Sequence, residues 1–122
     1  MKLNKFIFTG VLLFSNAVFS QQHEGLYPFT NGQISGYLDK TGKVVIQPQF
    51  DKADIFMDGL AHIKMAGLYG FADKTGKVVI PAQFEKVSSF IGQVPGFSEG
   101  FAAVKKGGKW GYIDKTGKFL VQ

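Results

Sequence analysis

The chain contains the pentapeptide Asp39-Lys40-Thr41-Gly42-Lys43 three times, the further copies being residues 73–77 and 114–118. Each copy precedes an apolar run, of which Val44-Val45-Ile46 is the first. An aspartate at the first turn position accepts hydrogen bonds from nearby backbone N–H groups, and glycine adopts a positive φ easily. The pentapeptide therefore predicts a hairpin tip, a type I turn that ends with a residue in the left-handed region. The residues expected to fix the three turns are Asp39, Gly42, Asp73, Gly76, Asp114 and Gly117.

The repeat extends beyond these turns. An acid-glycine pair lies fifteen residues before each turn aspartate, at Glu24-Gly25, Asp58-Gly59 and Glu99-Gly100. The spacing is 34 residues between the first two pairs and 41 between the next two. The seven additional residues fit best within residues 88–96, where glycine and proline cluster, and they predict a loop. The units are therefore residues 24–57, 58–98 and 99–122, the last of them truncated.

Each unit is expected to form three strands. In the second unit these are residues 60–65, residues 68–73 and the valine-rich run that follows the turn, with a primed turn at Ala66-Gly67 between the first two. Pro48 and Pro81 then interrupt the third strand, because proline cannot donate to a strand ladder. We expect an all-β fold of tandem antiparallel β-meander repeats, stacked into a short array because such units cannot bury an apolar face singly.

The first residues have the pattern of a secretory signal peptide. Lys2 and Lys5 precede an apolar stretch at residues 6–14, and small residues continue to Ser20. We expect cleavage before Gln21, which leaves residues 21–122 as one exported repeat domain in the periplasm or outside the cell. The apolar stretch is short for a membrane span, so an integral membrane protein is not expected.

The composition limits the classes of partner. There is no cysteine, which excludes a disulfide framework and a lipidated N-terminal cysteine. All fourteen basic residues are lysine, and loss of residues 1–20 leaves twelve of them against nine acids, a formal charge of +3. Arginine is the side chain that phosphate recognition favours, so nucleic acid is not an expected partner.

Residues 109–118, Lys-Trp-Gly-Tyr-Ile-Asp-Lys-Thr-Gly-Lys, resemble the signature of the bacterial WG repeat family, also called KWG repeats. The glycine and small apolar residues at 100–104 and the valine-rich run with Pro81 and Phe84 agree with that pattern. The resemblance covers residues 24–122. It implies a tandem all-β architecture and a role in binding or scaffolding, without a catalytic motif. Tyr69 and Ser35 stand where the signature has tryptophan.

Two sets of repeated polar residues invite a functional interpretation. The three turn aspartates could bind a divalent cation if the units stack in register, but the turn backbone alone accounts for them, and we expect no metal site. The lysines at the tips could form a basic stripe, with Lys74 and Lys115 as candidate contacts for an acidic partner. Such lysines more often keep exposed strands soluble. The stripe comprises Lys40, Lys43, Lys74, Lys77, Lys115 and Lys118.

The aromatic residues of the signature also have two interpretations. Trp110 and Tyr112 lie on the same face of a strand and could stack on a sugar ring. We favour instead a structural role, with Trp110 as the core anchor of its unit. The remaining candidate contacts belong to the inserted loop, which departs from the repeat: Ser88, Ser89, Phe90 and Gln93.

No residue set suggests catalysis or a cofactor. His23 and His62 lie outside the repeat pattern, and no serine occupies a nucleophile motif. We therefore expect a non-catalytic protein-interaction or scaffold module with an unidentified protein partner. The alternative is a glycan-binding or cell-wall-binding module. A homo-oligomer formed through the open last strand, residues 118–122, is a further option.

Overall fold

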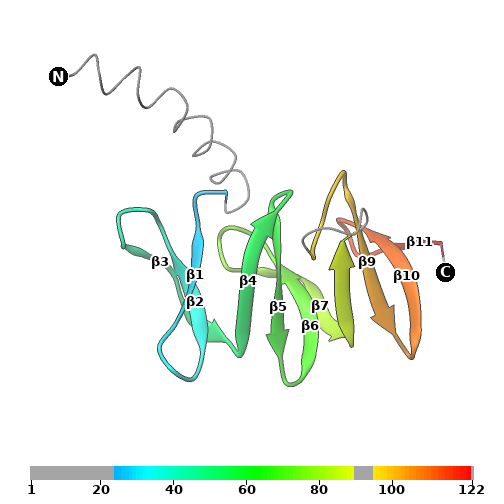
Figure 1. Ribbon diagram of the computed structural model, residues 1–122, viewed down its shortest axis with the longest axis horizontal. Coiled ribbons are helices and arrows are strands. Elements are labelled where there is room, and N and C mark those ends of the chain that lie inside the picture. Colours follow the sequence, from blue (N-terminus) through cyan, green and yellow to red (C-terminus); the bar gives the residue numbers. More distant parts are fainter. Residues whose placement is uncertain (1–23, 90–94, 122) are drawn as a thin grey trace, which may run out of the picture.

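The computed structural model describes residues 24–89 and 95–121, which form strands and turns (Figure 1). Three antiparallel sheets stand in a row along the longest axis, which confirms the expected all-β meander array. The described part of the chain contains no helix that is long and apolar enough to cross a membrane. The first sheet contains β1 (Tyr27–Thr30), β2 (Ser35–Leu38) and β3 (Val44–Phe50). The second contains β4 (Lys52–Met57), β5 (Leu60–Met65), β6 (Leu68–Ala72) and β7 (Val78–Phe84). The third contains β8 (Lys86–Ser89), β9 (Phe101–Lys106), β10 (Lys109–Asp114) and β11 (Phe119–Val121).

The strands β4 and β8 are additions to the three strands expected in each unit. Each follows the last strand of one sheet and pairs with the first hairpin of the next, as β8 does with β9. An acidic residue marks each crossing. The carboxylate of Asp51 accepts a hydrogen bond from the N–H of Ala66 at 2.8 Å, and Glu85 does the same for Gly108 at 3.2 Å. Each crossing therefore fixes the hairpin turn of the following sheet.

The structure corrects the expected inserted loop. Ser88 and Ser89 do not lie in a loop, because they belong to β8 and pair with Ala103 and Ala102 of β9. The other two loop candidates, Phe90 and Gln93, lie outside the described residues. The sequence did not predict this strand, because the expected insertion at residues 88–96 overlaps its second half.

The hairpin tips have the expected chemistry. Oδ1 of Asp73 accepts hydrogen bonds from the N–H of Thr75 at 2.9 Å, from the Thr75 hydroxyl at 2.6 Å and from the N–H of Lys77 at 3.1 Å. Gly76 completes the turn with a φ of 92°. The same bonds recur around Asp39 and Asp114. The threonine hydroxyl is the main cause that lowers the pKa of these three carboxyl groups, and backbone N–H groups add to it.

The prolines lie at irregular points of the strand register. β7 pairs with β6 through Ala72↔Val78, Phe71↔Ile80 and Tyr69↔Phe84, with a register shift on either side of the Phe71 pair. At that shift the backbone of β7 crosses close over Gly70, where a Cβ would lie 2.5 Å from the carbonyl oxygen of Ile80. Gly36 has the same relation to β3. The glycine of the signature is therefore required by the close approach of the next strand.

Two apolar cores lie between neighbouring sheets. Phe50 and Phe84, which follow the prolines, are buried in them, as expected. The core between the first two sheets consists of Leu26, Tyr37, Ile46, Phe50, Phe56, Ala61, Ile63 and Ala72. The core between the second and third consists of Leu60, Phe71, Ile80, Phe84, Phe97, Ala102, Val104 and Ile113. Because each core draws on two sheets, a single sheet cannot bury its own apolar face.

Candidate functional site

The edge of β10 is the first candidate site. In the second sheet, β7 runs far enough for Phe84 to pair with Tyr69 of β6. The described part of β11 pairs only with Tyr112 and Ile113 of β10. Within the described residues, the outer edge of β10 from Lys109 to Gly111 therefore has no neighbouring strand.

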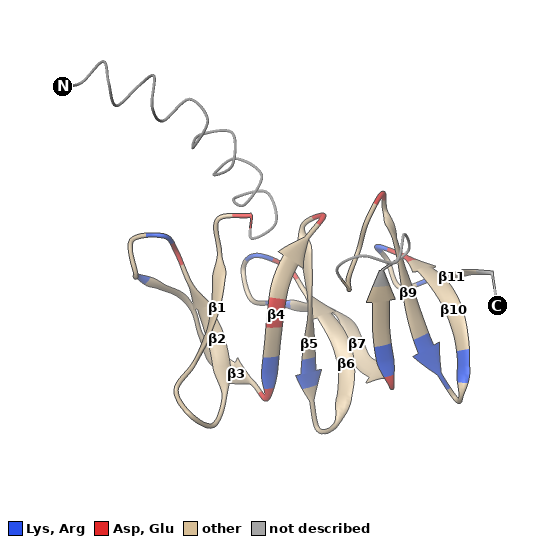
Figure 2. Cartoon of the chain, viewed as in Figure 1, with Lys and Arg blue, Asp and Glu red and all other residues tan. Residues whose placement is uncertain are grey.

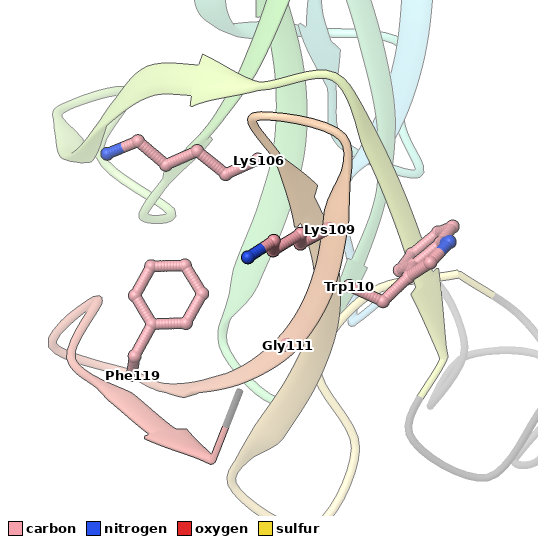
Figure 3. Close-up of a pocket in the computed structure, with 5 residues that line it drawn as sticks. All are labelled: Lys106, Lys109, Trp110, Gly111 and Phe119. Atoms are coloured by element: carbon pink, nitrogen blue, oxygen red, sulfur yellow. The ribbon is translucent and has the colours of Figure 1, made fainter.

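A cavity of about 330 Å³ lies beside this open edge. Figure 3 shows Lys109 and Phe119 extending toward the same side of β10, while the indole of Trp110 extends to the opposite side. Lys106 also borders the cavity, and its amino group lies 2.8 Å from Oε1 of Gln83. We call the residues that line this cavity the edge site: Lys106, Lys109, Trp110, Gly111 and Phe119.

Trp110 is not the core anchor that we expected. Its exposed fraction is 48%, and that of Tyr112 is 39%. The equivalent residue of the second sheet, Tyr69, is half-buried because the imidazole of His62 lies 5.5 Å from its ring and Phe84 lies beside it in the core. Ala103 stands where His62 would be, and in the described chain no strand runs beside Trp110 on the side of β10 away from β9. Burial at this position is thus decided by neighbouring strands and not by the signature itself.

The lysines at the hairpin tips alternate with acids instead of forming an uninterrupted basic stripe (Figure 2). The amino group of Lys74 lies 3.3 Å from Oε1 of Glu24, and that of Lys115 lies 3.5 Å from Oδ1 of Asp58. Two of the six candidate lysines are therefore paired with an acid of the preceding unit. The sequence contained a signal for this pairing, because the acid-glycine pairs keep a constant spacing to the turns.

The acid-glycine turns also bond directly to one another. The carboxylate of Glu24 accepts hydrogen bonds from the N–H groups of Asp58 at 2.7 Å and Gly59 at 2.9 Å. The carboxylate of Asp58 accepts one from Gly100 at 2.8 Å. We call these contacts, together with the lysine pairs, the tip ladder. It joins each unit to the next along one end of the array.

A second cavity, of about 440 Å³, contains the one buried histidine of the described residues. Nε2 of His62 lies 3.0 Å from Oδ2 of Asp54 on the neighbouring strand β4. Burial acts to raise the pKa of Asp54, but the hydrogen bond and charge of His62 outweigh burial and keep that pKa below its ordinary value. The remaining lining residues are Lys52, Lys64, Tyr69, Glu85, Lys86, Val87 and Pro95. They include no serine, threonine or cysteine for the imidazole to activate, and the pair joins β4 to β5.

The described residues bring together no group of three histidine, cysteine or acidic side chains that could hold a metal ion. Each turn aspartate bonds within its own turn, as Asp39 does through Thr41 and Lys43. The turn aspartates therefore serve to hold the backbone of their own turns.

Comparison with known proteins gives one family. The model described as "WG containing repeat" matches residues 36–69, 69–110 and 110–122. The three matches begin at Gly36, Tyr69 and Trp110, the glycine or the aromatic residue of the signature. At Gly36 and Gly70 the next strand of the sheet approaches the backbone most closely. Neither the curated proteins nor the solved structures give a significant match. The chain belongs to the family of proteins with WG-containing repeats.

Proposed function

We propose that this protein is an exported, non-catalytic interaction module that binds an extended protein segment at the edge site. The observation that carries the proposal is the outer edge of β10 beside the cavity at Gly111, which no strand of the described residues pairs with. A free strand edge presents alternating N–H and C=O groups, which an extended segment satisfies by adding one strand to the sheet. Export rests on the signal-peptide pattern of residues 1–20.

The first two sheets indicate which segment fits. There the corresponding place is occupied by the second half of β3 and of β7, which run over Gly36 and Gly70 and end in a buried phenylalanine. A segment in the same register on β10 places its backbone over Gly111 and an aromatic side chain opposite Trp110. Cross-strand aromatic pairs stabilise antiparallel sheets.

The charges at the edge site favour an acidic segment. Lys106 and Lys109 border the cavity, whereas the second sheet has Met65 and Leu68 at the same positions. In β3 and β7 the buried phenylalanine is followed by Asp51 and Glu85. The preferred ligand is therefore an extended segment with an aromatic residue followed by an acid.

A synthetic peptide with the sequence of residues 78–88 tests this proposal. We expect the fluorescently labelled peptide to bind the protein, measured by anisotropy, and to lose affinity when its phenylalanine is replaced by alanine. Trp110→Ala should weaken binding, while Val45→Ala, which truncates an exposed apolar side chain on β3, should not. Equal affinity for the two peptides, or no binding at millimolar peptide, would contradict the proposal.

A glycan-binding module is the second candidate. Trp110 and Tyr112 occupy alternate positions of β10 and are both exposed, as sugar stacking requires. Soluble cell-wall sugars should then quench the fluorescence of Trp110 and displace the protein from cell wall. Raised salt should weaken binding of an acidic segment but leave sugar binding nearly unchanged, which separates the two candidates.

A further inference from the structure

The tip ladder follows one rule at both junctions between sheets. The acid of one unit accepts backbone N–H groups of the next acid-glycine turn, and a lysine from the next DKTGK turn lies beside the same carboxylate. Glu24 does this for the second unit with Lys74 as the partner lysine. Asp58 does it for the third unit with Lys115.

The glycines of the second and third DKTGK turns make a further contact with the preceding sheet. A Cβ placed on Gly76 would lie 3.0 Å from Cγ2 of Ile46, and one on Gly117 would lie 3.3 Å from Cγ2 of Ile80. Each of these turns therefore packs on an isoleucine of the preceding sheet. Gly42, in the first turn, meets nothing within 4 Å.

The two ends of the array carry the two kinds of group that pair within the tip ladder: an acid at one end, and backbone N–H groups with a lysine at the other. At one end, Glu99 has a φ of 56°, close to the 53° of Glu24 and the 57° of Asp58, so the three acids share one backbone conformation. Within the described residues Glu99 has no hydrogen bond or ion pair. At the other end, the N–H of Gly25 and the amino group of Lys40 have no acid beside them in the described chain.

The first sheet also presents the matching apolar face. In the second sheet, Ile63, Ala72 and Val78 pack against the first sheet. The equivalent residues of the first sheet are only half-buried, because the described chain places no sheet in front of them: Phe29, Leu38 and Val44.

We propose that copies of this protein stack head to tail, with the acid-glycine turn of the third unit in one copy joined to the first unit of the next. Glu99 accepts the N–H groups of Glu24 and Gly25 from the second copy, and Lys40 of that copy lies beside the same carboxylate. The tip contacts of this interface lie away from the cavity of the edge site, because the acid-glycine tips and the β9–β10 hairpin lie at opposite ends of the third sheet (Figure 2). The interface joins two different surfaces, so it allows association to continue beyond a dimer.

The exposure of the ladder contacts indicates how strongly copies should associate. The lysines of the existing ladder are about half-exposed, with side-chain exposed fractions of 46% for Lys74 and 44% for Lys115. Exposed ion pairs contribute little singly and are screened by salt. We therefore expect association that rises with protein concentration and weakens when salt is raised.

Charge reversal at the two ends tests the proposal. The chain is expressed with its own N-terminal segment, and the exported product, cleaved before Gln21, is examined by sedimentation velocity over a concentration series at low and raised salt. Glu99→Lys and Lys40→Glu should each weaken association by about tenfold or more, because each places like charges together. Mixing the two variants should restore part of it, because each variant then meets an opposite charge at both ends.

A matched control separates this contact from general charge effects. Lys43→Glu changes the same net charge in the same turn, but the equivalent Lys77 and Lys118 form no ion pair in the described chain, so association should stay as in the parent. Circular dichroism checks that each variant keeps its sheets. A chain that stays monomeric up to millimolar concentration, or variants that associate like the parent, would overturn the proposal.

Discussion

The hydroxyl of Tyr37 on β2 donates a hydrogen bond to the main-chain carbonyl of Asp54 on β4, and so joins the first sheet to the second. Asp54 lies where the register between β4 and β5 shifts, so its carbonyl is turned out of the regular ladder. Tyr37 is fully buried, and its ring lies 4.8 Å from that of Phe56. The equivalent residue of the second sheet, Phe71, has no hydroxyl to offer.

Tyr37→Phe should reduce the free energy of unfolding by about 1–2 kcal/mol, because it leaves a partly buried carbonyl without its donor. The same variant should alter the response to alkali. Burial, and then the charge of Asp54, raise the pKa of Tyr37 well above its ordinary value. The stability linked to Tyr37 is thus present below about pH 10, the ordinary pKa of tyrosine, and is lost as the pH rises above it. Denaturant titrations at pH 7 and pH 11 should show the cost of Tyr37→Phe shrinking at the higher pH.

The hairpin tips predict a response to acid. The Thr75 hydroxyl, followed by backbone N–H groups, lowers the pKa of Asp73. The stability linked to Asp73 is therefore present above the unfolded pKa of about 3.9 and is lost as the pH falls below it. Thr75→Val should lower the melting temperature at pH 7 but by less at pH 3. Thr30→Val is the control, because the Thr30 hydroxyl accepts from Gly32 without a carboxylate, and its cost should not depend on pH in this range.

A methyl group added at Gly70 should lower the stability of the protein strongly. A Cβ at this position would lie 2.5 Å from the carbonyl oxygen of Ile80, and the backbone of β7 would have to move. Gly70→Ala should reduce the free energy of unfolding by about 3 kcal/mol, the upper range for overpacking. Gly67→Ala meets nothing within 4 Å and adds only the strain of a φ of 86°. Its expected cost is about 1–2 kcal/mol, and equal costs by chemical denaturation would contradict our account of Gly70.

An extended chain tests the register proposed for the edge site. Adding Ala-Gln-Phe-Glu after Gln122, as residues 82–85 follow Pro81, should continue β11 along β10 and place the phenylalanine opposite Trp110. We expect stabilisation by about 1–2 kcal/mol from partial burial of the new ring. The extension should also prevent binding of the free peptide. Adding Ala-Gln-Ser-Glu is the control, and equal stability of the two extended chains would argue against this register.

The local chemistry of the repeat carried most of what could be predicted from sequence. Asp73 and Gly76 determine their turn through groups at most four residues apart, so the pattern alone predicts the hairpin tips. The strand β4 escaped prediction because the register shift between Ala53 and Phe56 interrupts the alternation of apolar residues. A strand that contains a bulge is therefore not predicted from alternation of apolar and polar residues.

The candidate site was harder to predict because it depends on distant residues. Trp110 is exposed because the described chain places no strand beside it on the side of β10 away from β9, and nothing within its own signature indicates that. The bond from Gly59 to Glu24 spans 35 residues and is visible in the sequence only as a constant spacing. Local patterns thus predict the turns, whereas contacts between units require the assembled sheets.

The crossing of the chain at Asp51 and Glu85 has a consequence for how such proteins change length during evolution. Each crossing ends one sheet and begins the next, so a tandem duplication of a whole period always inserts four strands, wherever its ends fall. The new sheet meets, on both sides, the surfaces that its neighbours already present to each other. Gain or loss of a whole period is therefore structurally neutral, while loss of part of a period leaves a sheet without one of its strands.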